Sequence, residues 1–460
     1  MKKGWQTKKL GEVIEKTETV NPLQSPDAEF DYIDVSSVSN ATFEIEETQR
    51  LIGKNAPSRA RKLVRTNDIL FATIRPTLQR IAVVPEHLDK QVCSTGYFVL
   101  RPKQGIDHRF VFYSLFTENF FGRMECLQKG ASYPAVTDGD VRAQEIPIPP
   151  LAEQQRIVGL LDEAFGGLAT AKANAEKNLQ NARALFESHL QSVFTQRGSE
   201  GVEEEAAQSS IARPVSNPID VNDREMSRLN AGYVTKTGGR QATLRHIPGK
   251  LSLAVGMPTT GARRGWRWVP LGDLARLESG HTPSRKHPEY WGGTVPWIGI
   301  QDARENHGQR ITDTIEKTND QGIANSSARV LPENTVCLSR TASVGYVVVM
   351  GKPMATSQDF VNWVCSGNLK PEFLKYLILA EGREGLLRYA SGSVHQTIYF
   401  PEAKAFHICC PSLDEQTKIA RQCDKLREET QRLARIYEQK LAALDALKKS
   451  LLHQAFTGEL

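Results

Sequence analysis

The residues best suited to chemistry in this sequence are cationic side chains in loops that follow short apolar runs. Arg75 and Arg80 come after the run 68–73, and Arg340 comes directly after the related run 334–339. A guanidinium group binds a phosphate oxygen, or the edge of a base, through paired hydrogen bonds. We therefore expect these loops to bind an anionic ligand.

Motifs for catalysis are missing from the sequence. Gly53-Lys54, Gly249-Lys250 and Gly351-Lys352 are followed by Asn, Leu and Pro, so none of them is a nucleotide-binding P-loop. There is no Asn-Pro-Pro-Tyr-like adenine-methylation motif, and Glu402-Ala403-Lys404 matches the tail of a nuclease site only as a tripeptide that is common by chance. The 7 cysteines include no C-x-x-C pair. We expect no catalytic residue, metal or cofactor in this chain.

Length and composition indicate a protein of two or three domains. The chain has 460 residues, 40% of them hydrophobic, and a net charge of +5. This mild positive charge permits a nucleic-acid partner without demanding one. No apolar run approaches the length of a membrane span, and no apolar signal region follows the N-terminus, so we expect a cytoplasmic protein with no membrane partner.

The chain repeats itself once. Pro150-Leu151-Ala152-Glu153-Gln154 returns as Leu413-Asp414-Glu415-Gln416, and the pairs Glu153/Glu415, Ile157/Ile419 and Phe194/Phe456 all lie 262 positions apart. Two tandem copies can present similar surfaces related by a pseudo-twofold axis. Such an arrangement suits a target that is itself divided in two.

Each copy combines an α/β domain with a long helix. Short β-type runs separated by Gly, Pro, Asn and Asp, with a helical stretch over 110–127, predict the mixed domain. We place the five segments in chain order: a first domain at 1–150, a helix at 151–197, a polar and basic linker at 198–265, a second domain at 266–411 and a helix at 412–460. The linker is expected to be a solvated connector, with a basic strap on phosphates or on a partner as the alternative.

The two helices are expected to pack on each other as an antiparallel coiled coil. Apolar and small residues recur alternately three and four positions apart, which is the pattern of a coiled-coil seam. In the first helix the seam is predicted at 157, 161, 164, 168, 171, 175, 178, 182 and 185; in the second it is predicted at 419, 423, 426, 430, 433, 437, 440, 444, 447 and 451.

Taken together, these motifs and their order make the chain resemble the specificity subunit of a type I restriction-modification system. The duplicated helix openings are its most specific markers, supported by Tyr290-Trp291-Gly292-Gly293 and by Thr356-Ser357-Gln358-Asp359-Phe360. The first domain differs, since it has Cys93-Ser94-Thr95-Gly96-Tyr97 at the latter place and no Trp-Gly-Gly segment. The resemblance covers nearly the whole chain.

The resemblance implies an α+β fold with two target-recognition domains, each reading half of a bipartite sequence in double-stranded DNA. The helices would set the gap between the halves and dock two methyltransferase subunits. Catalysis would belong to these subunits, which use S-adenosylmethionine, and to translocase and nuclease subunits, which use ATP and Mg²⁺.

The resemblance also makes DNA the expected ligand of the loops. In the first domain the candidates are Arg59, Arg61, Lys62, Arg75, Arg80, Lys129, Ser132 and Tyr133. In the second domain they are Arg285, Lys286, Arg340, Ser343, Ser393, His395 and Gln396. Lys and Arg supply affinity through phosphates, while an amide such as Gln396 can pair bidentately with adenine. A plain solvated position is the alternative for these residues, and Trp291 and Trp297 are expected to be core anchors.

Two other functions remain as alternatives. The chain can be the recognition part of a fused methyltransferase or nuclease, although the repeats and the linker account for its whole length. It can also be a coiled-coil scaffold without a role in DNA binding, which would not need two loop-bearing domains. Neighbouring genes for an adenine methyltransferase and a helicase-nuclease would favour the specificity subunit.

Overall fold

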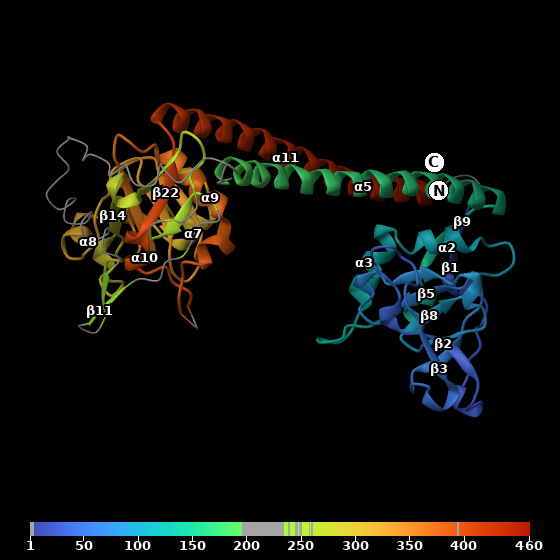
Figure 1. Ribbon diagram of the computed structural model, residues 1–460. Helices are drawn as coiled ribbons and strands as arrows, with labels where there is room; N and C mark the ends of the chain where they lie inside the picture. Colours follow the sequence, from blue (N-terminus) through green and yellow to red (C-terminus); the bar gives the residue numbers. More distant parts are fainter. Residues whose placement is uncertain are drawn as a thin grey trace. The chain divides into compact units, whose positions relative to one another are not determined.

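The computed structural model describes residues 4–195, 234–237, 240–243, 247, 251–256, 258, 261–392 and 395–460 (Figure 1). The chain forms two compact units, one made of Met1–Asn178 with Ile436–Leu460 and the other of Leu179–Arg435. The border between the units falls within both long helices. Each unit therefore contains one α/β domain and one part of each helix.

The first domain is built on two small sheets. The order β6-β5-β8 gives a central, fully buried β5, and the order β3-β2-β7-β4 gives the second sheet. The strands are β1 (Gln6–Lys9), β2 (Glu29–Ile33), β3 (Gln49–Ile52), β4 (Ala60–Leu63), β5 (Ile69–Ala72), β6 (Ile81–Val83), β7 (Val92–Ser94), β8 (Tyr97–Leu100) and β9 (Glu145–Ile148), the last of which pairs with β1.

Four helices complete the first domain: α1 (Leu10–Val13), α2 (His108–Ser114), α3 (Glu118–Leu127) and α4 (Asp138–Arg142). The single helical stretch expected over 110–127 is divided between α2 and α3. Thr117 separates them, because its side chain accepts a hydrogen bond from Phe120 N and so caps the start of α3. The mixed α/β character predicted for this domain is confirmed.

The second domain has a larger sheet in the order β14-β21-β18-β19-β16 and two three-stranded sheets, β17-β15-β20 and β12-β22-β13. The strands are β12 (Leu253–Val255), β13 (Arg267–Pro270), β14 (Ala275–Ser279), β15 (Trp291–Ile298), β16 (Arg310–Ile311), β17 (Glu316–Thr318), β18 (Val336–Ser339), β19 (Val347–Met350), β20 (Ala355–Thr356), β21 (Phe360–Cys365) and β22 (Phe406–Cys410). The helices are α7 (Ile300–Glu305), α8 (Asp320–Ala324), α9 (Pro371–Leu387) and α10 (Phe400–Lys404).

The second domain begins earlier than the sequence indicated. We expected a linker up to residue 265, but Leu253 and Val255 in β12 are fully buried in the core of the second unit, where β12 pairs with β22. The apolar run around β12 is simply the first strand of this domain. Upstream, β10 (Val234–Thr237) and β11 (Arg240–Thr243) form an antiparallel hairpin. Most of 198–250 lies outside the described residues.

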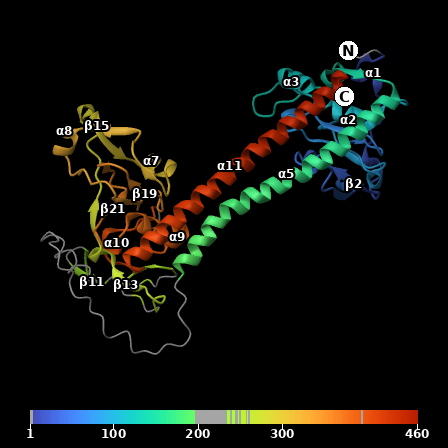
Figure 2. The ribbon, with the colours of Figure 1, turned by 90° about the horizontal axis from the view of Figure 1, so that it is seen from above.

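The two long helices are α5 (Leu151–Phe194) and α11 (Leu413–Thr457). Within each unit they run side by side in opposite directions, as predicted (Figures 1 and 2). In the first unit Arg156, near the start of α5, donates to the carbonyl oxygen of Leu460, and Lys172 forms an ion pair with Asp445 at 3.1 Å.

The seam between the helices departs from its predicted positions at the same two places in both copies. Asn178 and Lys440 are exposed, and the next residues, Leu179 and Leu441, are partly buried instead. The same shift recurs at Leu185 and Leu447, which are exposed while Phe186 and Lys448 are partly buried. An α-helix has 3.6 residues per turn, so a strict alternation of three and four drifts off the contact line. The leucines that we expected to be covered thus remain at the surface.

A buried glutamine ties the start of each long helix to its domain. Gln154 Oε1 accepts a hydrogen bond from Asp107 N at 2.8 Å, and Gln416 Oε1 accepts one from Lys370 N at 2.9 Å. Both amide groups also donate to the backbone before their helix, to Pro149 O and Pro411 O. The glutamine of the repeated Glu-Gln motif therefore has a structural role where each domain joins its long helix.

Candidate nucleic-acid interface

In the first domain, two loops distant in sequence come together beyond the end of β5. The backbone N of Val136 donates to Thr73 O at 2.9 Å, and Arg75 N donates to Pro134 O at 2.7 Å. The Arg75 guanidinium donates to Ser132 O at 3.2 Å and lies 4.8 Å from the centre of the Tyr133 ring. Tyr133 is 71% exposed. The pair of loops thus presents a cation stacked on an aromatic ring at the surface.

Arg75 has a strained backbone at this point. Its φ is 50°, in the left-handed region that costs a residue with a side chain about 1 kcal/mol. The hydrogen bonds to the neighbouring hairpin hold this conformation. Such strain is typical of residues whose placement serves a function, because the surrounding structure must maintain it.

The second domain contains the same pair of loops. Ile398 N donates to Arg340 O at 2.9 Å, as Val136 N does to Thr73 O. Each hairpin has a left-handed glycine at its start, Gly130 with φ 105° and Gly392 with φ 115°. A Cβ at Gly392 would lie 2.4 Å from a backbone oxygen of the same hairpin, so glycine is required there. The repeat therefore extends to the detailed geometry of the loops.

Arg75 and Arg340, which both follow related runs in the sequence, do not occupy equivalent positions in the structure. β18 takes the place of β5, since each pairs antiparallel with the strand after it and with β21 or β8 on its other side. In this register Arg340 occupies the position of Thr73, at the end of the strand. The counterpart of Arg75 is Ala342, which is also left-handed with φ 59°. The two domains therefore differ in charge at the tip of the turn.

Arg340 is half-buried at the base of its loop. Its Nη2 donates to Gln358 O at 3.0 Å, and its guanidinium carbon lies 4.9 Å from the centre of the Phe400 ring. Burial lowers the pKa of this guanidinium from its ordinary value. Its Nε is buried and has no hydrogen-bond partner within the described part of the chain. The orientation of the Arg340 guanidinium is thus fixed by Gln358 O, while its Nε–H remains a donor without an acceptor in the described part of the chain.

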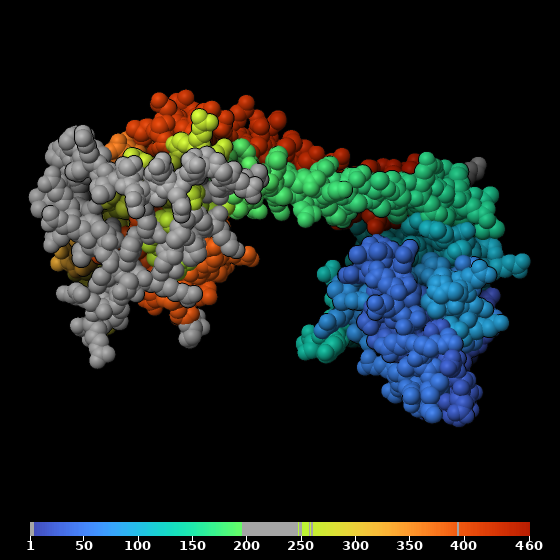
Figure 3. Space-filling model, viewed as in Figure 1, coloured from blue at the N-terminus to red at the C-terminus, as the bar shows by residue number. Residues whose placement is uncertain are grey.

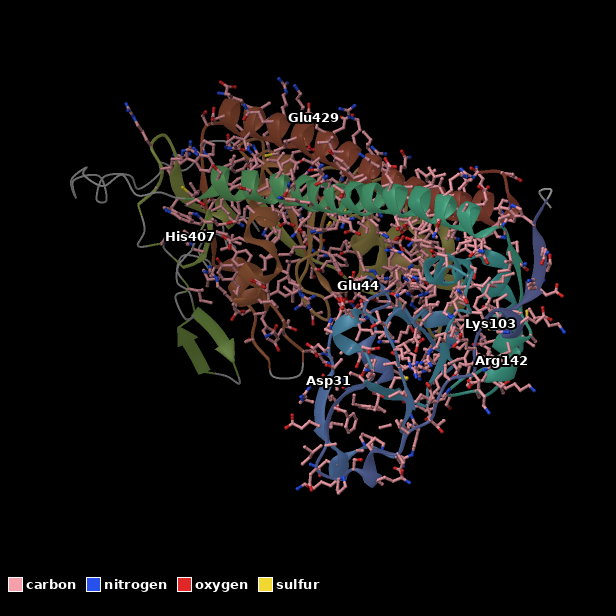
Figure 4. All side chains as sticks on the ribbon, turned by 90° about the vertical axis from the view of Figure 1, so that its right-hand side faces the viewer. Asp31, Glu44, Lys103, Arg142, His407 and Glu429 are labelled. Carbon is pink, nitrogen blue, oxygen red and sulfur yellow. The ribbon has the colours of Figure 1, made fainter. Side chains whose placement is uncertain are left out.

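Two predicted DNA-binding residues of the first domain have other roles in the structure. Lys62 Nζ donates to Tyr97 O at 2.6 Å and forms an ion pair with Asp138 at 3.0 Å. Arg142, labelled in Figure 4, lies over the Phe98 ring beside it. Lys62 is thus largely buried, and its charge is used inside the domain.

Arg80 is the second of these residues. Its Nη1 donates to the backbone oxygens of Val35, Ser36 and Val38, the shortest of these bonds being 2.6 Å. We expected this side chain to project from its loop. Instead it holds the segment that follows β2. A guanidinium with three carbonyl partners would have to give them up to reach a phosphate.

Arg285 in the second domain is also engaged. It forms an ion pair with Glu316 and lies 3.9 Å from the centre of the Trp291 ring and 5.2 Å from that of Trp297. Because of this pair, the pKa of the Glu316 carboxyl is lowered. Trp297 is buried, in agreement with the anchor role predicted for it, and Trp291 is partly buried.

The remaining candidates lie at the surface of the loops or close to them. Those that are exposed are Arg59, Lys129, Ser132, Lys286, His395 and Gln396. Arg61 and Ser343 are partly buried, and Ser393 lies outside the described residues. Arg59 is linked to the loop pair through its carbonyl oxygen, which accepts from Thr95 N next to Gly96. Gly96 O in turn accepts from Thr73 N.

Gln358 is a further candidate, which the sequence pattern alone did not single out. This residue is exposed, its backbone oxygen holds Arg340, and its side-chain oxygen accepts a hydrogen bond from Thr282. An amide in this place can contact a base edge or a phosphate. In the sequence its motif, Thr-Ser-Gln-Asp-Phe, indicates the family and gives no sign of a contact role.

Within the described ranges, no group of three His, Cys, Asp or Glu side chains could hold a metal ion. None of the described helices is long and apolar enough to cross a membrane.

A repeated α/β domain with the same surface loop pair, together with two long antiparallel helices, defines a protein built as a tandem repeat. The model of the type I restriction modification DNA specificity domain matches residues 2–178 and again 263–439. These matches cover more than half of the chain, so it belongs to this family. The chain is a DNA sequence-specificity subunit with two recognition domains.

Known proteins resemble the chain along most of its length. The HindI specificity subunit of Haemophilus influenzae is 27% identical over 340 residues, which are 71% of this chain and 72% of that protein. A solved structure that concerns the complex assembly and conformational transition of the type I R-M system has a TM-score of 0.74 at 25% identity. The match covers 100% of this chain and 99% of that chain. The HsdS subunit of Thermoanaerobacter tengcongensis has a TM-score of 0.62 at 25% identity, covering 100% and 98%.

Proposed function

We propose that each recognition domain reads one half of a bipartite sequence in double-stranded DNA through its loop pair. The observation that carries the proposal is the repetition of one loop geometry with different side chains. In the first domain the loops present Arg75 stacked on Tyr133; in the second they present Arg340 beside Gln358. Equal scaffolds with unequal contact groups suit two half-sites of different sequence.

The contacts divide into two kinds. Exposed cations such as Arg59, Lys129 and Lys286 bind phosphates and supply affinity that decreases as salt increases. Arg75 pairs with a guanine edge or a phosphate, and Gln396 and Gln358 pair with adenine edges in the major groove. Lys62 and Arg80 support the domain from inside and do not belong to this contact set.

The long helices set the gap between the half-sites and dock two methyltransferase subunits. Leu185 and Leu447, which are 51% and 47% exposed, lie at equivalent positions of α5 and α11. Apolar side chains that recur at the same place of both repeats suit two copies of one partner. These partners would use S-adenosylmethionine to modify adenine, and translocase and nuclease subunits would use ATP and Mg²⁺. The complex would act in the cytoplasm, and this chain would hold no cofactor.

Reconstitution tests the proposal. The purified chain with S-adenosylmethionine, ATP and Mg²⁺ is expected neither to methylate nor to cleave DNA, whereas addition of the methyltransferase subunits gives methylated adenine in both halves of a bipartite site. Sequencing of the methylated DNA is the measurement. Methyl transfer by a partner-free preparation would support a fused enzyme instead, and the absence of DNA binding by the complete complex would support a plain coiled-coil scaffold.

A further inference from the structure

A tyrosine from each recognition domain bonds to an aspartate on a long helix. In the first unit, Tyr113 of α2 donates its hydroxyl to Asp162 of α5. Arg109, one turn earlier on α2, has its Nη2 at 2.8 Å from the same carboxylate and at 3.1 Å from the tyrosine hydroxyl. Tyr113 is buried, while the Asp162 side chain is 35% exposed. The carboxylate thus meets both a hydroxyl and a guanidinium of the domain.

The same arrangement occurs in the second unit. Tyr376 of α9 donates its hydroxyl to Asp424 of α11, and Lys375 Nζ lies 3.4 Å from this carboxylate. The Lys375 side chain is 7% exposed, so its charge is directed at the helix rather than at solvent. Asp162 comes 11 residues after the start of α5, and Asp424 comes 11 residues after the start of α11. Both repeats therefore have the tyrosine–aspartate pair at the same distance from the helix start. The cation beside the aspartate differs, being Arg109 in the first unit and Lys375 in the second.

Beside each pair, the inner face of the helix packs against its domain through apolar residues. In the first unit the helix face next to Asp162 packs through Ile157 and Leu161 into the core that contains Phe110, and Figure 3 shows α5 lying against the first domain. In the second unit Ile419 and Cys423 pack into the core that contains Phe373. Apolar contact is roughly proportional to area and has no preferred direction, whereas a hydrogen bond to a charged group has a defined geometry.

Two polar contacts along one helix are enough to fix a rotation. Gln154 and Gln416 hold the helix starts, and the aspartates lie eight residues further on, about 12 Å along the axis. In the second unit Arg427 of α11 adds a further contact, because it donates to the backbone oxygens of His307 and Gly308. The tyrosine bond is the directional contact at this level that both units share.

We propose that Tyr113–Asp162 and Tyr376–Asp424 are positioning pairs that fix the orientation of each recognition domain on its helix and so determine which gap between half-sites is accepted. These residues do not touch DNA; they act through the placement of the loops that do. The inference rests on the bipartite reading proposed above. It predicts that loss of one hydroxyl changes the tolerance for the gap and leaves the half-site bases unchanged.

The test uses the full chain in complex with its methyltransferase subunits. Initial methylation rates are measured on a series of DNAs with the same half-sites and gaps from two base pairs shorter to two longer than the native one. For Tyr113→Phe and for Tyr376→Phe, the preference for the native gap over the next gap is expected to fall by about tenfold, which corresponds to about 1.4 kcal/mol. The phenylalanine ring keeps the apolar packing.

Three variants make the result specific. Asp162→Ala changes a partly exposed helix position and is expected to give the same broadening as Tyr113→Phe, which keeps the test open should one variant fold poorly. Asp162→Asn retains an acceptor oxygen and is expected to restore most of the gap preference. Tyr32→Phe is the matched control, because Tyr32 is also buried and donates to a carboxylate, that of Asp34, but within its own domain.

The outcomes separate the two proposals. A narrow, wild-type gap profile in folded Tyr113→Phe and Tyr376→Phe complexes would overturn the positioning role, and so would equal broadening in Tyr32→Phe. Altered half-site bases would also overturn it, since the loops would then have been disturbed. If the wild-type complex recognised one continuous sequence without a gap, the bipartite function itself would fail, whatever the variants do.

Discussion

At the scale of single residues, the position of a side chain in the turn after the central strand decides its role. Thr73 and Arg340 end equivalent strands, while Arg75 and Ala342 occupy the left-handed position two residues later. An arginine at the strand end is partly buried and held by Gln358 O. An arginine at the tip lies over an exposed ring and is directed toward solvent.

We predict that Arg75→Ala weakens DNA binding by about 1 to 3 kcal/mol if the guanidinium pairs with a base, with the loss confined to the first half-site. If it binds a phosphate instead, the dependence of log K on log salt falls by about one. Titration of the complex with labelled DNA at several salt concentrations measures both quantities.

The control for this prediction is Arg50→Ala. Arg50 is an exposed arginine of the same domain and lies on β3. It forms ion pairs with Glu29 and Asp31 of the neighbouring strand β2, both at 3.0 Å. Its removal is expected to leave affinity unchanged. Equal affinities for the two variants would return Arg75 to the class of ordinary surface charges.

At the scale of elements, the long helices keep a continuous seam by shifting it. Ala175 and Ala182 are buried in α5, and the covered position then moves to Phe186 instead of Leu185. Gly166 and Gly167 lie inside α5 without interrupting it, although they can let the helix bend under strain.

Insertion of four residues between Asn178 and Leu179 is predicted to change the accepted gap by up to about two base pairs. Four residues add about 6 Å of helix, and one base pair rises about 3.4 Å. The seam should accept them as a local stutter. Sequencing of the methylated genome of cells that express the variant with its partners reports the half-sites and the gap together.

A control with unchanged length replaces the exposed residues Glu176, Lys177 and Gln180 by alanine and is expected to keep the native gap. An active insertion complex with the native gap would rule out the helices as the ruler. The same half-sites at a new spacing would establish it.

At the scale of the whole molecule, the chain consists of two units, each with its own core. The first domain packs through Phe110 and Val141 around helix residues Ile157 and Leu161, and the second has a separate core that includes Trp363 and Phe406. Separate cores allow one domain to be changed without unfolding the other.

Exchange of residues 1–150 for the corresponding domain of a relative is therefore predicted to change one half of the methylated sequence and to leave the other half as it was. The domain taken from the relative must have a tyrosine and an arginine at the positions of Tyr113 and Arg109. It must also have a backbone N–H that donates to Gln154, so that it docks on α5. Methylome sequencing of the exchanged chain is the measurement. Simultaneous change of both halves would show that the domains do not read DNA independently.

Much of this architecture follows from sequence alone, because it depends on local periodicity and on repetition. The offset of 262 residues, the seam spacing and the alternation of short β-type runs with turn residues predicted two α/β domains and two antiparallel helices. The same signals identified the family. Such patterns persist wherever the chain places them, since burial repeats along each element.

The tertiary structure alone decided which cations remain available and where the domains begin. Lys62 and Asp138 are 76 residues apart, and Arg80 and Val38 are 42 apart, so no local pattern reveals that these side chains are already bonded. The same holds for β12, whose partner β22 follows about 150 residues later in the chain. Hydrogen bonds between distant segments depend on how the chain closes on itself, and this closure is what separates the residues that support the recognition loops from those that reach beyond them.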